Sequence, residues 1–291
     1  MFPTIILLFF VCAGIGAAMS IAADRKMKRG ERGDEEREVA LIVDGLAMSD
    51  ATNDDEVSAA AHAFRAPLAE EKWYLDLLMD QSAGKLNAKQ KEYLIRAQEN
   101  NTRLTTIANN LLNISRVTNG TMIVCPETGD IVARTREIVD AHATCMEEYA
   151  CTARITARPA AIFLNIDTDL YSEILGHLLM NAMQYNENKN PIITITIKKE
   201  PSHITVSVTD NGKGMATKES AHIFKKFSRT RKGIKRVPEG SGLGLHVAHT
   251  IAAKLGGSLT YANTTKKGST FTLALPAEGV APHKGTRPLA R

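Results

Sequence analysis

An uncharged run near the start of the chain is the feature that most restricts the fold. Residues Thr4–Ala23 contain no charged side chain, and a helix of about twenty residues is about 30 Å long, which matches the hydrocarbon core of a bilayer. A cleaved signal peptide is the alternative, but such peptides carry their basic segment ahead of the apolar run. Here the basic residues follow it, at Arg25, Lys26, Lys28 and Arg29. We therefore expect one transmembrane helix over residues 1–23, with the N-terminus outside and the rest of the chain in the cytoplasm.

The composition excludes several classes of protein. The chain has 291 residues, of which 44% are hydrophobic and 23% charged, so it is neither intrinsically disordered nor collagen-like. Its four cysteines show neither zinc-site spacing nor the density of a disulfide framework. The net charge of +4 is too small to indicate a nucleic-acid partner. Residues 24–51 carry charges of both signs, which is typical of a linker or a signalling helix.

Two helices are predicted after this linker. Residues from about Asp54 to Met79 have a helical pattern interrupted only by Pro67, and after a turn over residues 81–87 a second helix runs to about Val117. The second helix carries apolar or small residues in alternating steps of four and three, interrupted by Asn100. These residues are Tyr93, Ala97, Leu104, Ile107, Leu111 and Ile114. Because two helices alone bury little surface, we expect residues 52–119 to form a homodimer in which two hairpins make a four-helix bundle.

His62 lies on the outer face of the first helix. On a helical wheel it stands opposite the apolar stripe of Phe64, Leu68, Leu75, Leu78 and Met79. A solvated surface histidine is the simplest interpretation. However, Pro67 removes the hydrogen bond to the carbonyl of Ala63 and bends the helix just beyond His62. Trp73 and Leu77 lie on the histidine side, either as bundle core if the stripe is displaced or as a docking surface for a partner.

The second half of the chain has a mixed pattern. A helix over residues 171–185 precedes two strands, 193–197 and 204–208, in which Ile or Val alternates with Thr or Ser. Asp210-Asn211-Gly212-Lys213-Gly214 leads into a long basic loop, and Gly240-Ser241-Gly242-Leu243-Gly244 opens a helix to about Leu255. Two further strands are expected near residues 258–262 and 269–275. Each glycine cluster alone is typical of a simple turn, so the information is in their order.

In this order the segments resemble the N, G1, F and G2 boxes of the GHKL ATPases. The correspondence covers a helix with an inward-facing Asn181, the turn after Asp210, a lid, the glycine loop and a final Gly-Ser-Thr-Phe strand. It implies a Bergerat-type α/β sandwich over residues 120–276, with ATP held between the helices and a mobile lid. The fold class is therefore α+β: a transmembrane helix, an antiparallel helical hairpin and an ATP-binding domain.

The resemblance also assigns roles to individual residues. Asn181 would bind Mg²⁺, because an amide oxygen suits a hard, octahedral ion that keeps several waters. Asp210 would accept a hydrogen bond from the exocyclic amine of adenine, with Tyr185 beside the base. The other nucleotide-binding positions are those where the backbone approaches closely, Gly212 and Gly214, and those whose amides form a phosphate cradle, Gly240, Gly242, Leu243 and Gly244.

The segment between the two glycine clusters is strongly basic. Counted from Lys213 to Glu239, it holds nine Lys or Arg and two acidic residues, which a nucleic-acid site or a solvated loop would also explain. Its only aromatic residues are Phe224 and Phe227, in the string Ile-Phe-Lys-Lys-Phe-Ser-Arg, which matches the F box of the family. We therefore expect a basic lid over a nucleotide, with Phe227 and Arg229 at the site and no nucleic acid as partner.

The hairpin selects one family among the GHKL proteins. His62-Ala63-Phe64-Arg65-Ala66-Pro67-Leu68 resembles the phosphoacceptor box of sensor histidine kinases, and Leu111–Arg116 resembles the end of their second helix. This resemblance, from about residue 52 to 276, implies autophosphorylation of His62 by ATP with Mg²⁺, and transfer of the phosphoryl group to an aspartate of a response regulator. Together with the uncharged run over residues 4–23, it predicts a cytoplasmic catalytic part held at the cell (inner) membrane by one span.

Some residues depart from the family pattern. Ala63 replaces the acidic residue that usually follows the histidine, and Ala66 replaces a frequent Thr or Asn. His177 stands where a second Asn is common and would be an unusual magnesium ligand, and Gln184 replaces a frequent Lys. Two hypotheses follow: a working kinase with weak phosphatase activity, and a dimeric scaffold that binds ATP or a partner with little phosphoryl transfer. Residues 277–291 are expected to be a disordered tail.

Overall fold

The computed structural model describes residues 54–280, apart from residues 83, 238–239 and 265–267. The predicted transmembrane helix, the charged linker and the last eleven residues of the tail therefore lie outside the described residues. Within the described ranges, no helix combines the length and the apolar character needed to cross a membrane.

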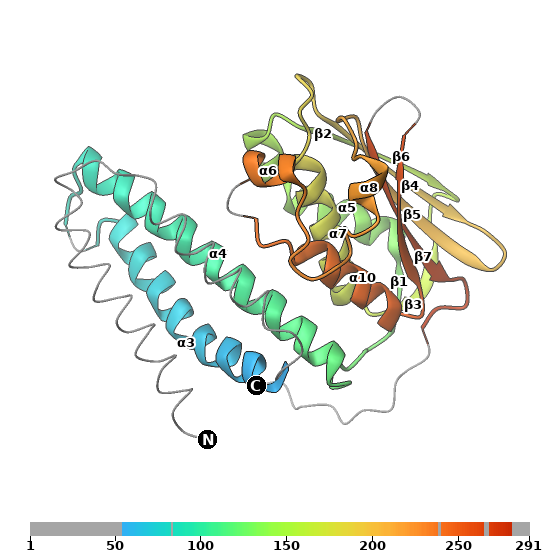
Figure 1. Cartoon of the computed structure of the whole chain (residues 1–291), viewed down its shortest axis with the longest axis horizontal. Helices are drawn as coiled ribbons and strands as arrows, with labels where there is room; N and C mark the ends of the chain where they lie inside the picture. The colour runs from blue at the N-terminus through green and yellow to red at the C-terminus, as the bar shows by residue number, and fades with distance from the viewer. Residues whose placement is uncertain (1–53, 83, 238–239, 265–267, 281–291) are drawn as a thin grey trace. The chain divides into compact units, whose positions relative to one another are not determined.

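The predicted helical hairpin is confirmed. α3 (Asp54–Met79) and α4 (Ala88–Thr118) pack against each other along their length (Figure 1). α4 begins with a capping box in which the Asn87 side chain accepts from the Gln90 amide and the Gln90 side chain accepts from the Asn87 amide, both at 2.9 Å. The side chains of Ala61 and Leu75 on α3 and of Leu112 on α4 are buried.

The rest of the described chain is built around a five-stranded mixed sheet with the order β2-β4-β5-β7-β6. Its strands are β2 (Thr152–Arg158), β4 (Ile192–Lys199), β5 (His203–Asp210), β6 (Ser258–Asn263) and β7 (Ser269–Pro276). β2 runs parallel to β4, and all other neighbours are antiparallel. The alternation predicted for β4 and β5 is confirmed, because Ile193, Ile195 and Ile197 are fully buried while Thr194 and Thr196 between them are half-buried.

Helices α5 (Ile131–Ala141), α7 (Thr168–Gln184) and α10 (Gly244–Lys254) cover one face of this sheet (Figure 1). Their apolar faces, together with the inward residues of the strands, form one hydrophobic core. A two-stranded sheet of β1 (Glu127–Asp130) and β3 (Phe163–Ile166), and the short helix α6 (Ala143–Glu148), complete this layer. The sequence did not predict β1 and α6, because such short segments, Glu-Thr-Gly-Asp and Ala-Thr-Cys-Met-Glu-Glu, carry no period.

The predicted boundary of the tail is corrected by the structure. Val280 is buried, its amide donates to the Asn165 carbonyl at 2.7 Å, and its carbonyl accepts from the Asn165 side chain at 3.1 Å. The Ala277 amide likewise donates to the Ser202 carbonyl. Residues 277–280 therefore belong to the folded domain, because tertiary hydrogen bonds hold a segment whose composition alone indicates a loose end.

Candidate functional site

Asp210 ends β5 and organises the turn that follows. Its Oδ1 accepts hydrogen bonds from the Gly212 amide at 2.7 Å and from the Ser269 amide at 3.2 Å. Burial raises the pKa of this carboxyl, and the two backbone hydrogen bonds partly oppose that rise. A Cβ on Gly212 would lie 2.9 Å from Asp210 Oδ1, so only glycine fits beside the carboxylate. Both backbone bonds use Oδ1, and the Ser269 side chain also hydrogen-bonds to this carboxylate.

Gly214 packs closely against another segment of the same domain. It has a φ of +69°, and a Cβ there would collide with the Asn263 side chain and the Gly268 carbonyl. Asn263 in turn accepts from the Met215 amide at 3.0 Å and donates to the Met215 carbonyl at 2.8 Å. The glycine is therefore needed to close the turn onto the end of β6.

The glycine loop before α10 is in contact with Tyr185 and with the lid. A Cβ on Gly240 would lie 3.2 Å from Tyr185 Oη and 3.3 Å from Arg229 Nη2. Gly242 has a φ of +68°, and a Cβ there would lie 2.8 Å from the Phe227 carbonyl carbon. The structure thus brings together five predicted residues from three separate segments, with the lid lying directly on the glycine loop.

Gly244, the first residue of α10, lies against His177 of α7. A Cβ at this position would be 3.0 Å from His177 Nδ1. The Nε2 atom on the other side of the ring is buried without a hydrogen-bond partner among the described residues. Burial lowers the pKa of His177 to about 4, so the ring is neutral at pH 7.

A carboxylate from the same helix lies behind this ring. Glu173 Oε1 is 3.9 Å from His177 Nε2, too far for a hydrogen bond, and Glu173 accepts from the Asn113 side chain of α4 instead. Burial raises the pKa of Glu173. Since burial favours the neutral form of both groups, the Glu173–His177 contact is not an ion pair at neutral pH. Asn113, Glu173 and His177 form a chain of contacts from the hairpin to the glycine loop that sequence reasoning missed.

Three other predicted residues take no part in the contacts described above, and they differ in how far they are buried. The Leu243 side chain is fully buried in the hydrophobic core, so only its backbone is available to a ligand. Asn181 is half-buried on α7, one turn after His177. His62 is exposed on α3, as the helical wheel predicts.

The first part of the lid is attached to α10 through aromatic and imidazole rings. The Phe224 ring stacks on His249 with a centroid separation of 4.9 Å, and the Phe224 carbonyl accepts from His246 Nδ1 at 2.8 Å. Burial lowers the pKa of His246, although its bond to Phe224 opposes this. Phe224 therefore anchors the lid to the helix layer, and Phe227 follows it with a φ of +58°.

Two family models match the chain. The model of the His Kinase A (phospho-acceptor) domain matches residues 52–120. The model described as Histidine kinase-, DNA gyrase B-, and HSP90-like ATPase matches residues 166–279. Together the two models span more than half of the chain.

The curated relatives agree with both models. The sensor-like histidine kinase SenX3 of Mycobacterium tuberculosis is 25% identical over 259 residues, which cover 88% of this chain and 62% of SenX3. The chain belongs to the sensor histidine kinases. The sensor histidine kinase ZraS of Escherichia coli K12 is 27% identical over 219 residues, covering 75% of this chain and 44% of ZraS. This sensor histidine kinase thus spans less than two thirds of the length of these relatives.

A solved structure shares the fold. The crystal structure of full-length ShkA in complex with AMPPNP matches with a TM-score of 0.64 and 21% identity, covering 80% of this chain and 47% of that chain. The expected order of a helical hairpin and a GHKL-type α/β domain is therefore confirmed for this histidine kinase.

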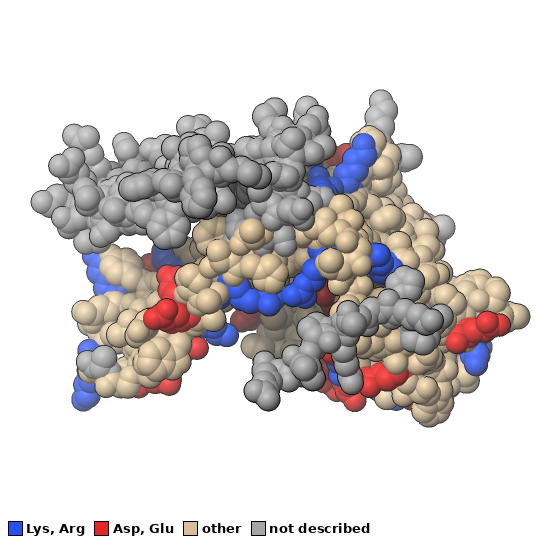
Figure 2. Space-filling view, turned by 90° about the horizontal axis from the view of Figure 1, so that it is seen from below, with Lys and Arg blue, Asp and Glu red and all other residues tan. Residues whose placement is uncertain are grey.

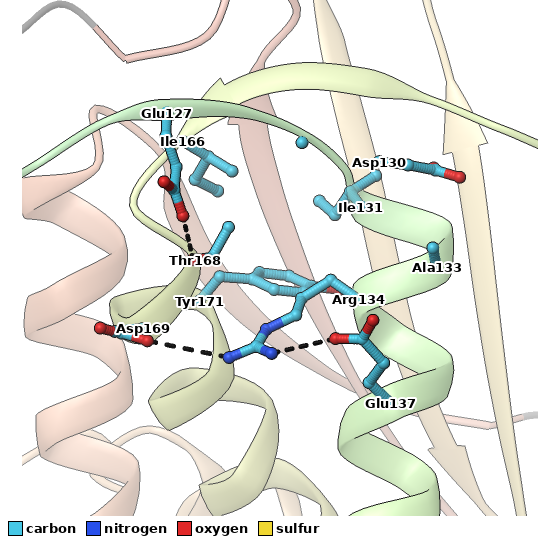
Figure 3. Close-up of a pocket in the computed structure, with 11 residues that line it drawn as sticks. Glu127, Asp130, Ile131, Ala133, Arg134, Glu137, Ile166, Thr168, Asp169 and Tyr171 are labelled. Carbon is cyan, nitrogen blue, oxygen red and sulfur yellow. Dashed lines mark hydrogen bonds and ion pairs between the residues drawn. The ribbon is translucent and has the colours of Figure 1, made fainter.

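The kinase also has a pocket away from the predicted nucleotide residues (Figure 3). It has a volume of about 440 Å³ and is lined by β1, α5 and the start of α7. Arg134 spans it, 3.0 Å from Glu137 and 3.7 Å from Asp169, and Glu127 accepts from the Thr168 hydroxyl at 2.9 Å. These polar groups pair with one another, and none of the predicted site residues lines the pocket.

The face of the kinase shown in Figure 2 carries positive and negative side chains interspersed, rather than one field of a single sign. Among the described residues, no group of three or more His, Cys, Asp or Glu side chains could hold a metal ion.

Proposed function

We propose that this chain is an ATP-dependent protein histidine kinase that phosphorylates itself on His62 and passes the phosphoryl group to an aspartate of a response regulator. One observation carries the proposal. An exposed histidine stands inside the segment that matches the phosphoacceptor domain, and the same chain folds a GHKL-type domain in which Tyr185, two lid residues and two glycines of the glycine loop lie together. The bound AMPPNP of ShkA supports ATP as the ligand.

The reaction follows from the residue types. A ring nitrogen of His62 attacks the γ-phosphorus, an N–P bond forms, and the bond to the β,γ-bridging oxygen breaks to release ADP. The ring proton goes to solvent, because Ala63 offers no carboxylate. Such a general base typically contributes about 10² to 10⁴-fold to a rate, so slow autophosphorylation is expected.

The nucleotide is held by groups from three segments. The Asp210 carboxylate accepts from the exocyclic amine of adenine, while its Oδ1 atom holds the Gly212 and Ser269 amides. Tyr185 lies beside the base, and the amides of residues 240–244 face the phosphates at the start of α10, where four backbone N–H groups lack helical partners. The neutral His177 ring adds no charge there. Phe227 and Arg229 complete the site from the lid.

The residues present fit a magnesium ion. The site offers the Asn181 amide oxygen and no cluster of carboxylates among the described residues, which suits an ion that keeps several waters and binds the phosphates directly. When bound, Mg²⁺ supplies charge neutralisation at the phosphates. His177 is a poor ligand for it, because a hard ion prefers oxygen over an imidazole nitrogen.

The hairpin is proposed to form a homodimer. Large apolar side chains of both helices are exposed in the single chain, with exposed fractions from 38% for Leu78 to 57% for Trp73. The others are Phe64, Tyr74, Tyr93, Ile95 and Leu104. Tyr93 and Leu104 belong to the predicted seam, so a second hairpin would cover part of this surface. Trp73 stands on the His62 side and is proposed to face the response regulator.

The cellular location follows from the sequence. The uncharged run over residues 4–23 and the basic residues after it support a single-pass protein of the inner membrane, with the catalytic part in the cytoplasm.

Radiolabelling tests the proposed activity. The purified protein is incubated with γ-labelled ATP and Mg²⁺, and we expect an acid-labile, alkali-stable label that His62→Gln abolishes. His203→Gln, a matched substitution at the far end of β5, should keep the label. Label that survives His62→Gln would contradict the proposal.

A scaffold is the second candidate function, favoured by Ala63 and Ala66, which both lack the polar groups usual at these positions. It predicts nucleotide binding without label at any time. A pull-down with the phosphorylated receiver domain of a partner protein would then test whether the chain binds that partner without transferring a phosphoryl group to it.

A further inference from the structure

The lid contains two short helices, α8 (Thr217–Ser220) and α9 (Arg231–Arg236), and α9 is attached to the end of α7, the helix that carries Asn181. α9 ends in Arg236, whose Nε donates to the Gln184 carbonyl at 2.6 Å and whose Nη2 donates to the Asn186 carbonyl at 2.5 Å. Carbonyl groups at a helix C-terminus lack helical donors and carry the negative end of the helix dipole. Gln184 is the last residue of α7 and Asn186 lies just beyond its C-cap, and a guanidinium fork is well matched to two neighbouring carbonyls.

These two carbonyls flank Tyr185, which α9 covers. A Cβ on Gly233 of α9 would lie 3.2 Å from Tyr185 Cε1, so the tyrosine ring packs on the helix backbone. The start of α9 is held by Thr230, whose hydroxyl accepts from the Gly233 amide at 2.9 Å. Arg229 donates to the carbonyls of Gly233 and Val237. The helix is thus held at both ends while it lies over Tyr185.

This arrangement obstructs the proposed nucleotide site. A base beside Tyr185 needs the surface that Gly233 occupies. Arg229, which lies against Gly240 and donates to the Gly233 and Val237 carbonyls, must give up these contacts before it can bind phosphates. Arg236 is exposed, so its two bonds can be exchanged for bonds to water without unfolding the domain.

We propose that Arg236 is a positioning residue of the lid, a latch that holds α9 over Tyr185 and whose opening sets the rate at which nucleotide enters. The inference rests on the proposed function, because it takes the nucleotide to bind beside Tyr185.

Stopped-flow fluorescence with the methylanthraniloyl derivative of ATP measures this rate in the full chain. In the wild-type protein the observed rate should reach a plateau as nucleotide concentration rises, because latch opening becomes limiting. Arg236→Ala should raise the plateau about fivefold, the change expected when an exposed hydrogen-bonded contact of a charged group is lost. Arg236→Lys should raise it similarly, because lysine keeps the charge but cannot bond both carbonyls in a fork.

Lys225→Ala is the matched control. It removes one positive charge from an exposed position of the same lid and leaves the latch intact. It should lower the rate at low nucleotide concentration, through weaker attraction to the phosphates, and leave the plateau unchanged. The opposite result would be a wild-type plateau in both Arg236 variants, with a lower rate at low nucleotide concentration in Arg236→Ala only. Arg236 would then act by its charge alone, and the latch would be refuted.

Hydrogen exchange separates the latch from the proposed function. Without nucleotide, both Arg236 variants should speed exchange of the Ile234 and Val237 amides, which bond within the lid, and Lys225→Ala should not. Unchanged exchange in a protein that binds nucleotide would overturn the latch alone. Failure of the wild-type protein to bind any nucleotide would overturn both the proposed function and the gating role.

Discussion

Replacement of His177 tests the electrostatics of the helix that carries Asn181. The His177 side chain is 19% exposed, and burial lowers its pKa from 6.5 to about 4. Between these values the unfolded chain binds a proton that the folded chain does not. The folded state therefore has its full stability above pH 6.5 and loses this contribution as the pH falls toward 4.

The size of the effect follows from the two pKa values. At about 1.4 kcal/mol per pH unit, the complete loss between pH 7.5 and pH 4 is about 3 kcal/mol, and about 2 kcal/mol of it has occurred by pH 5. His177→Gln removes the titration and keeps a polar side chain of similar length. The free energy of unfolding of the wild-type protein should therefore fall by about 2 kcal/mol more than that of the variant between pH 7.5 and pH 5.

Urea unfolding followed by circular dichroism measures this difference at pH 7.5, 6.5, 5.5 and 5. Equal dependence of the free energy on urea in both proteins would show that the unfolded states are comparable. An ion pair between His177 and Glu173, whose Nε2 and Oε1 atoms are 3.9 Å apart, would have the opposite effect. The wild-type protein would then gain stability relative to the variant as the pH falls, and the burial argument would be refuted.

Three further substitutions test the nucleotide site and the phosphoacceptor. Asp210→Asn keeps an Oδ1 acceptor for the Gly212 and Ser269 amides, so the protein should stay folded. Its ATP affinity, measured by calorimetry, should fall about tenfold or more because the carboxylate at the adenine amine is lost. Unchanged affinity would contradict the assignment of Asp210. Gly242→Ala forces a side chain into a backbone with φ of +68° and against Phe227, which should cost about 1–3 kcal/mol in thermal unfolding and abolish nucleotide binding. Ala63→Glu should raise the initial rate of His62 labelling about tenfold or more, whereas the isosteric Ala63→Gln should not; equal rates would remove the missing base as the cause of slow transfer.

Local sequence signals were sufficient for α3, α4, α7, α10 and the strands β4 to β7. α3 begins and ends at the predicted Asp54 and Met79, because a long 3.6-residue period outweighs the single break at Pro67. The strands β4 and β5 were equally readable, since one buried face imposes strict alternation. β1, β3 and β2 were not predicted, because they are short or sit at an edge, and their partners lie far away in sequence.

The sequence by itself determined which chemical groups the site has: His62 on an exposed helix face, glycines on both sides of a basic lid, and Asn181 and Asp210 at the ends of regular elements. These depend on periodicity and on backbone angles, which are properties of neighbouring residues. Only the tertiary structure decided how the groups meet. Packing between distant segments places Arg229 on Gly240 and brings Arg236 to the carbonyls on either side of Tyr185. The same packing pairs Glu173 with Asn113 and not with His177. No local pattern encodes them, because burial and hydrogen-bond competition arise only when the segments are brought together.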